Sequence, residues 1–108
     1  MTTDHINIIS ERLLHRFDPI MVWLFGSYAK GKDRLDSDID LCLVVEADTP
    51  EAREKLEYDI EYYLYREDDM LPIDVIVYSK QEWLDNISDP ASFATQILKD
   101  GVVLYERQ

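Results

Sequence analysis

The chain has 108 residues, of which 46% are hydrophobic, and this size and composition fit one globular domain over residues 1–108. Eleven lysines and arginines stand against 23 aspartates and glutamates, giving a net charge of −12 that argues against direct binding to nucleic acid or to an anionic membrane. The single cysteine, Cys42, excludes an internal disulfide, and together with the lack of a signal-peptide pattern it predicts a cytoplasmic protein.

Alternating helical and extended patterns predict an α/β fold, with a small mixed β-sheet flanked by helices. Ile6, Ile9 and Leu13 recur at helical spacing in the first helix, and Thr49-Pro50 opens a long helix as its N-cap and first helical residue. In chain order the predicted elements are helix 4–16, strand 20–25, a helical turn at 27–31 closed by Gly31, strand 39–45, the long helix from 50, strand 72–78, helix 80–86, a last helix capped by Ser88-Asp89-Pro90 and ending at Lys99, and strand 102–105.

Residues 25–41 contain the motifs that suggest chemistry, and a phosphate-binding P-loop is the first candidate. Gly26, Gly31 and Lys32 match that motif, but Asp33 stands where its magnesium ligand, a serine or threonine hydroxyl, is required. A long helix should also follow, whereas here the next strand is predicted within seven residues. The P-loop interpretation is therefore disfavoured.

A calcium-binding loop is the second candidate for the same segment. Asp36, Asp38 and Asp40 occupy its first, third and fifth positions. The sixth position is Leu41 instead of glycine, and the twelfth is Ala47 instead of glutamate. This interpretation is disfavoured as well.

A third interpretation combines Gly26-Ser27 with the pair Asp38 and Asp40, whose side chains share one face of the predicted strand. Two adjacent carboxylates repel each other unless a cation lies between them, and oxygen ligands select magnesium. Asp74 adds a carboxylate on another apolar strand, where an ionised group is costly unless it is paired or coordinated. Gly26-Ser27 begins a helical turn, whose free N–H groups and hydroxyl suit a phosphate. Simpler roles stay open, namely exposed strand positions for the aspartates and an N-cap for the serine.

At these residues the sequence resembles the polymerase-β-like nucleotidyltransferase superfamily, and more narrowly the minimal nucleotidyltransferases of prokaryotes. The matching pieces are Leu-Phe-Gly-Ser-Tyr-Ala-Lys-Gly, Ser-Asp-Ile-Asp-Leu, Ile-Asp-Val-Ile and the ending Ile-Leu-Lys-Asp-Gly-Val-Val-Leu-Tyr-Glu. The resemblance as a whole extends over nearly the entire chain. The resemblance implies the fold of that superfamily and two sets of site residues, which are the catalytic magnesium ligands Asp38, Asp40 and Asp74, and the nucleotide-binding residues Gly26, Ser27 and Lys30. Many members carry arginine at the position of Lys30. Lysine has the same charge as arginine but lacks its forked hydrogen-bonding geometry.

The same resemblance implies an enzyme that uses ATP as substrate and two Mg²⁺ ions as cofactors. The chain length leaves no room for a domain that binds the acceptor, so the acceptor is expected on another molecule. In the resembling group the usual partner is a HEPN-domain toxin, and the expected assembly is a hetero-oligomer in which the chain transfers AMP to a tyrosine of the toxin and acts as antitoxin. Two other functions stay open: a non-catalytic nucleotide-binding antitoxin that masks its partner, and a small-molecule nucleotidyltransferase of the aminoglycoside-modifying kind.

Side chains outside this segment give weaker indications. Cys42 is expected to be a small buried hydrophobe and not a nucleophile. The long helix carries four tyrosines, which are expected in the core and at its rim, and an exposed subset of them is a candidate partner interface. They are Tyr58, Tyr62, Tyr63 and Tyr65.

Overall fold

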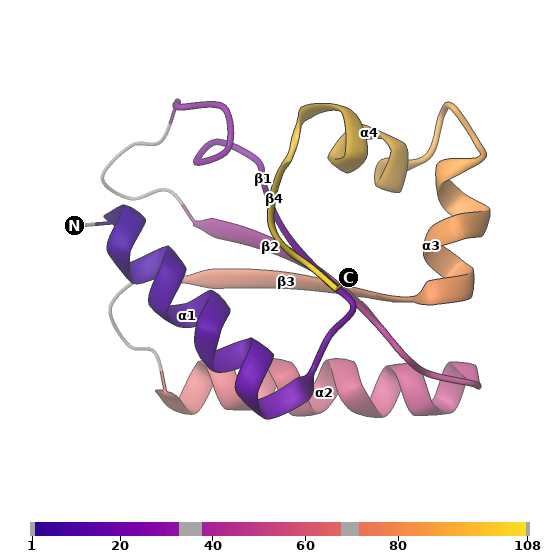
Figure 1. Ribbon diagram of the computed structural model, residues 1–108, viewed down its shortest axis with the longest axis horizontal. Helices are drawn as coiled ribbons and strands as arrows, with labels where there is room; N and C mark the ends of the chain where they lie inside the picture. Colours follow the sequence, from indigo (N-terminus) through magenta and orange to yellow (C-terminus); the bar gives the residue numbers. More distant parts are fainter. Residues whose placement is uncertain (1, 33–37, 68–71, 108) are drawn as a thin grey trace.

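The computed structural model describes residues 2–32, 38–67 and 72–107, and within these ranges the chain forms four helices and four strands (Figure 1). In chain order these are α1 (Thr2–Phe17), β1 (Met21–Phe25), β2 (Ile39–Val45), α2 (Pro50–Glu67), β3 (Ile73–Ser79), α3 (Lys80–Ile87), α4 (Phe93–Asp100) and β4 (Val102–Glu106). None of the described helices is both long and apolar enough to cross a membrane.

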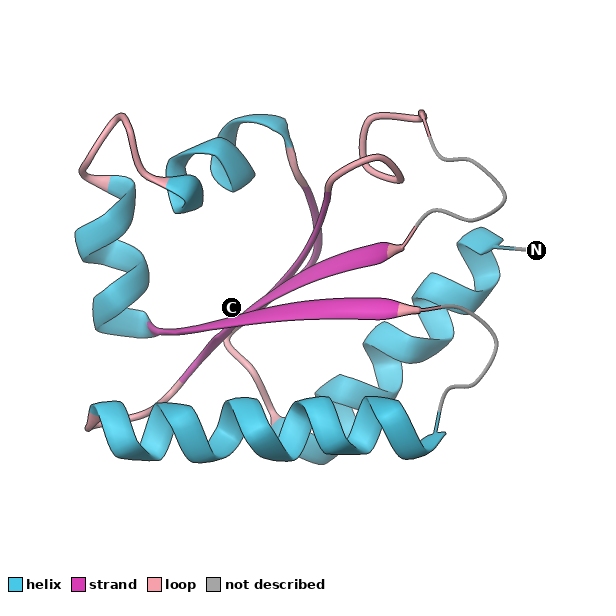
Figure 2. Cartoon of the chain, turned by 180° about the vertical axis from the view of Figure 1, so that it is seen from behind, coloured by secondary structure: helices cyan, strands magenta, loops and turns pink. Residues whose placement is uncertain are grey.

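The strands form one mixed sheet in the order β3-β2-β1-β4. β1 pairs in antiparallel fashion with β2 and with β4, whereas β2 and β3 are parallel. A parallel pair needs a long crossover, which α2 provides, so β2 and β3 begin at the same end of the sheet (Figure 2). The fold is therefore α/β with a small mixed sheet, and the predicted fold class is confirmed.

The helices cover the two faces of the sheet unequally. α1 and α2 pack against one face, where their apolar stripes join Ile39, Leu41 and Leu43 of β2 in the main core. α3 and α4 contribute Trp83 and Ile97 to a smaller cluster on the other face. None of the described helices covers the second face near the starts of β2 and β3, because α3 and α4 lie toward its other parts (Figure 1).

The predicted element bounds agree with the observed ones to within two residues, apart from the start of the last helix. The turn at 27–31 is closed by Gly31, which has a φ of 69°. Its N–H donates to the Tyr28 carbonyl at 3.4 Å, and the Lys32 N–H donates to the Ser27 carbonyl at 2.9 Å. These two bonds are the Schellman pattern of a helix C-terminus, so the predicted helical turn is confirmed.

The predicted cap of the last helix, Ser88-Asp89-Pro90, is wrong. α4 begins later, and its N-cap is Ser92, whose hydroxyl accepts a hydrogen bond from the Thr95 N–H at 3.0 Å. Asp89 instead accepts from the Ala91 N–H at 3.0 Å, which closes a local turn around the proline. Ser88 is the C-cap of α3, so the segment ends one helix before the next begins.

Candidate active site

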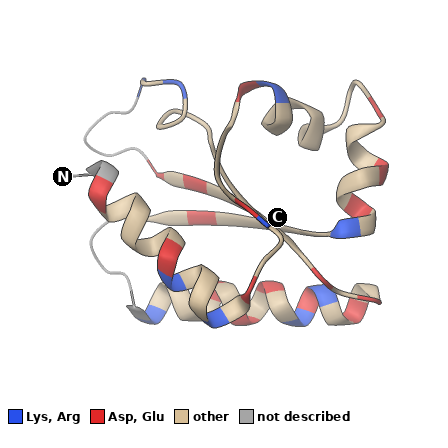
Figure 3. Cartoon of the chain, viewed as in Figure 1, with Lys and Arg blue, Asp and Glu red and all other residues tan. Residues whose placement is uncertain are grey.

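The parallel register of β2 and β3 brings the predicted carboxylates together. Asp40 and Asp74 are direct neighbours across the two strands, and Asp38 precedes Asp40 by two residues on the same face. Figure 3 shows acidic positions side by side near the starts of these strands. Asp38 and Asp74 are exposed and Asp40 is half-buried, so the group lies at the open part of the second sheet face.

The pKa values of two of the three aspartates, Asp40 and Asp74, are raised in the folded chain. Partial burial raises the pKa of Asp40 above its ordinary value, and the negative charges of Asp74 and Asp38 raise it further. The pKa of Asp74 is also raised, first by desolvation, then by a side-chain hydrogen bond with Asp38 and by the charge of that residue. A cation bound between the carboxylates would remove this repulsion.

The donor chemistry of the group fits a divalent cation, because carboxylate oxygens are the ligands that Mg²⁺ takes in proteins. Within the described residues, however, no three histidine, cysteine, aspartate or glutamate side chains already surround a point closely enough to hold a metal ion.

Gly26 joins the carboxylates to the turn at 27–31. Phe25, the last residue of β1, is the partner of Asp40 across the strands, so Gly26 directly follows this pair. It has a φ of 76°, and a Cβ atom at this position would collide with the Asp40 carboxylate, whose Cγ lies 3.1 Å from the Cβ position. Only glycine adopts this positive φ without strain and leaves room for the Asp40 carboxylate, so the turn can lie directly against Asp40.

The turn carries the other two predicted nucleotide-binding residues, Ser27 and Lys30. Ser27 is half-buried at the start of the turn, next to Gly26, and Lys30 is exposed near its end. Lys30 also lines a cavity of about 280 Å³ between the turn and α4. The structure thus brings Gly26, Ser27 and the three aspartates to one region, with Lys30 at its edge.

Sequence reasoning did not identify the residues that α4 contributes beside the turn. Phe93, Gln96 and Asp100 line the same cavity as Gly26 and Lys30. The ring of Phe93 meets that of Phe25 edge-on, with centroids 5.5 Å apart. No local sequence pattern predicts the contact between Phe25 and Phe93, because it arises from packing between segments far apart in the chain.

Cys42 lies deeper on the same face of β2 as the aspartates and is fully buried. Burial raises the pKa of its thiol to about 12, so the thiol stays protonated and is not a nucleophile, as the sequence predicts. Asp33 and Asp36, on which the two disfavoured motifs depend, lie outside the described residues.

Three solved structures are similar to this fold. A putative nucleotidyltransferase from Sulfolobus solfataricus is 22% identical, with a TM-score of 0.63, and the match covers 94% of this chain and 78% of that one. A toxin–antitoxin structure with AMP-PNP is 21% identical, with a TM-score of 0.54 and coverage of 94% and 74%. A mutant of the toxin–antitoxin pair MntA-HpeT is 20% identical, with a TM-score of 0.53 and the same coverage.

No curated protein matches the chain. The family model described as "Polymerase beta, Nucleotidyltransferase" matches residues 7–108, which include the turn, the three aspartates and every strand. The chain therefore belongs to the polymerase beta nucleotidyltransferase family.

Proposed function

We propose that this chain is a Mg²⁺-dependent nucleotidyltransferase that transfers AMP from ATP to a tyrosine hydroxyl of a HEPN-domain toxin, and so acts as its antitoxin. The observation that carries the proposal is the closeness of Gly26 to Asp40, by which the turn at 27–31 lies beside three carboxylates. A phosphate group on the turn would therefore lie next to cations held by these carboxylates. Family membership supports nucleotidyl transfer. The structural neighbours, one a toxin–antitoxin structure with AMP-PNP, support the nucleotide and the kind of partner.

In this proposal Asp38, Asp40 and Asp74 hold the magnesium ions, and Gly26, Ser27 and Lys30 hold the phosphates of ATP. The backbone N–H groups at the start of the turn and the Ser27 hydroxyl donate to phosphate oxygens, and the Lys30 ammonium group offsets their charge. When bound, magnesium supplies positive charge to the phosphate oxygens and to the leaving pyrophosphate.

Asp74 is the proposed base. Its carboxylate lies at the exposed edge of the group, where an acceptor hydroxyl can approach and give up its proton. Asp74 takes the hydroxyl proton while the acceptor oxygen bonds to the α-phosphorus of ATP. The bond to pyrophosphate breaks in the same displacement, so the products are the adenylylated acceptor, pyrophosphate and one proton.

The test uses purified chain, labelled ATP, Mg²⁺ and the purified protein encoded by the neighbouring gene. We expect label on a tyrosine of the neighbour with the wild type and none with Asp38→Asn/Asp40→Asn. Asp48→Asn, an exposed position before α2, is the matched control for loss of a charge and should label normally. If the wild type labels nothing, yet both it and the double variant neutralise the neighbour, the chain acts by masking and the enzymatic proposal fails.

A further inference from the structure

The outward face of α2 presents a row of tyrosines that the fold does not use. Tyr58, Tyr62 and Tyr65 are 68%, 52% and 83% exposed, and their spacing of four and three residues aligns them along one side of the helix. Ile60 and Leu64, which point to the opposite side, enter the main core. We call Tyr58, Tyr62 and Tyr65 the tyrosine ridge.

Two of the ridge residues are ordered against each other. The rings of Tyr58 and Tyr62 are stacked, with centroids 6.3 Å apart and planes 10° apart. Large exposed aromatic side chains that are already positioned on a helix lose little conformational entropy when a partner covers them. Tyrosine is also enriched at protein interfaces and among the residues that dominate their affinity.

The charge beside the ridge is negative. Glu51 lies in line with it, and Glu54 and Glu61 lie on the flank that faces away from α1. All three are exposed, and none forms an ion pair within the residues that the structure describes. Two of the three basic residues of α2 are already paired, Arg53 with Glu57 and Glu82, and Lys55 with Asp59. The third, Arg66, lies on the opposite flank of the ridge.

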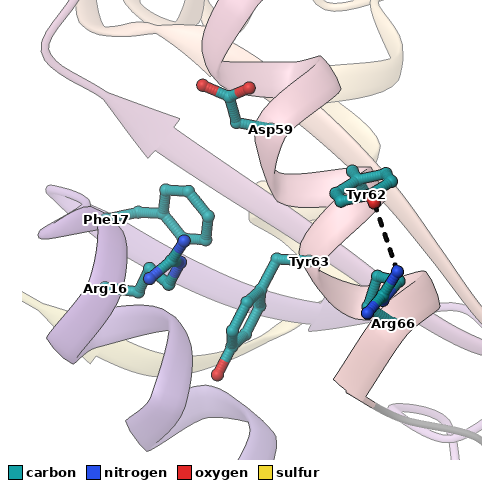
Figure 4. A pocket seen from close by; sticks show the side chains of 6 residues that line it. All are labelled: Arg16, Phe17, Asp59, Tyr62, Tyr63 and Arg66. Carbon is teal, nitrogen blue, oxygen red and sulfur yellow. Dashed lines mark hydrogen bonds between the residues drawn. The ribbon is translucent and has the colours of Figure 1, made fainter.

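The opposite flank, which faces α1, is basic. A hollow of about 520 Å³ lies there, and Arg16, Tyr63 and Arg66 are among the side chains that line it (Figure 4). The Arg16 guanidinium is 5.3 Å from the centre of the Tyr63 ring. The Arg66 guanidinium lies over the Tyr62 ring at 5.9 Å and donates to its hydroxyl at 3.4 Å. Neither arginine forms an ion pair within the described residues, so the face has an acidic flank, an aromatic ridge and a basic flank.

We propose that the tyrosine ridge and its acidic flank, Glu54 and Glu61, are the docking surface for a basic protein, and that this protein is the partner in the proposed function, on which the inference rests. Lysine and arginine side chains of such a partner can lie over the tyrosine rings and pair with the free carboxylates. The basic flank repels the same partner, so docking is directed toward the side away from α1. The net charge of −12 adds long-range attraction.

The position of this surface has a functional consequence. α2 covers the sheet face opposite to the one that bears Asp40 and Asp74. A mutation in the ridge therefore leaves the carboxylates and the binding of ATP intact, and a mutation of the carboxylates leaves the docking surface intact.

The test is a calorimetric titration of the purified neighbour protein into four purified variants and the wild type. Tyr58→Gln/Tyr65→Gln removes the two most exposed rings and keeps good helix formers. Glu54→Lys/Glu61→Lys reverses the acidic flank. Leu84→Gln, 48% exposed on α3, is the control for an exposed apolar side chain elsewhere. Asp38→Asn/Asp40→Asn is the control for the active site.

We expect Tyr58→Gln/Tyr65→Gln and Glu54→Lys/Glu61→Lys, which we call the two ridge variants, to weaken binding of the neighbour by at least about tenfold. Their affinity for ATP should equal that of the wild type. Leu84→Gln and Asp38→Asn/Asp40→Asn should bind the neighbour normally. The proposal is overturned if the ridge variants bind as tightly as the wild type, if Leu84→Gln weakens binding equally, or if the neighbour is acidic or does not bind. If the wild type does not label the neighbour but binds it, and the ridge variants bind it more weakly, the enzymatic function is refuted and the docking surface is supported.

Discussion

Gly26 is the residue on which the site geometry depends most directly. Its φ of 76° is unfavourable for any residue with a Cβ, and the space that a Cβ would occupy belongs to the Asp40 carboxylate. We predict that Gly26→Ala displaces Asp40 from the turn, lowers the free energy of unfolding by at least about 2 kcal/mol and abolishes binding of Mg²⁺-ATP. Urea unfolding and nucleotide titration measure the two effects.

Gly31 offers a matched control, since it has nearly the same backbone conformation, with a φ of 69°, and open space where its Cβ would lie. Gly31→Ala should therefore lower the free energy of unfolding only through backbone strain, by about 1 kcal/mol. The difference between the two variants isolates the contact with Asp40. Equal losses of stability and equal nucleotide affinity would show that this contact does not matter.

Asp40 also makes stability depend on pH. Its pKa in the folded chain is raised above the ordinary value of 3.8, so the folded protein binds this proton more tightly than the unfolded chain. The free energy of unfolding therefore falls as pH rises from about 3.8 through the raised pKa, and stays lower at higher pH. We predict that Asp40→Asn is more stable than the wild type at about pH 7, and that this gain disappears at about pH 3. Urea unfolding at both pH values measures it, and a gain that persists at the lower pH contradicts the electrostatic explanation.

At the scale of elements, α3 is the helix with the clearest local start. The Glu82 N–H donates to the Ser79 hydroxyl at 3.1 Å, and the Ser79 N–H donates to the Glu82 carboxylate at 2.8 Å, which is a complete capping box. Glu82 also pairs with Arg53 of α2 at 3.2 Å, so the cap connects two helices. We predict that Ser79→Ala lowers the free energy of unfolding by about 1 kcal/mol in urea unfolding. Ser88→Ala, at the exposed end of the same helix, should lower the free energy of unfolding by less. A larger loss for Ser88→Ala than for Ser79→Ala would contradict the role of the capping box.

Elements with local signals could be predicted from the sequence. Thr49-Pro50 opens α2, Gly31 closes the turn, and the alternation in β2 places Asp38 and Asp40 on the face opposite to the core residues. The start of α4 was predicted wrongly, because Ser88 and Ser92 both have capping chemistry and only tertiary packing selects between them.

Relations between distant elements could not be derived from local patterns. The pairing of Asp40 with Asp74 depends on parallel register between strands joined by an 18-residue helix. The cavity beside Gly26 depends on α4 folding back toward β1. Residue types therefore predicted which side chains belong to the candidate site, and the register of the sheet determines which of them lie side by side.

For the whole molecule, the net charge of −12 has two separate origins. Three aspartates are concentrated at one end of a sheet face, and the remaining excess is spread over the surface, including the free glutamates beside the tyrosine ridge. Diffuse surface repulsion is screened by any salt. Repulsion within the carboxylate group is relieved most effectively by a cation that binds there.

This difference leads to a prediction for the whole molecule. Both NaCl and MgCl₂ should raise the free energy of unfolding, but at equal ionic strength MgCl₂ should raise it more, because Mg²⁺ also binds the folded site. At a free Mg²⁺ concentration of about ten times Kd the extra stabilisation is about 1.4 kcal/mol. Urea unfolding of wild type and Asp38→Asn/Asp40→Asn in both salts measures it. The double variant should keep the response to NaCl and lose the additional effect of MgCl₂; if it keeps both, magnesium acts only on the diffuse charge and these aspartates do not bind it.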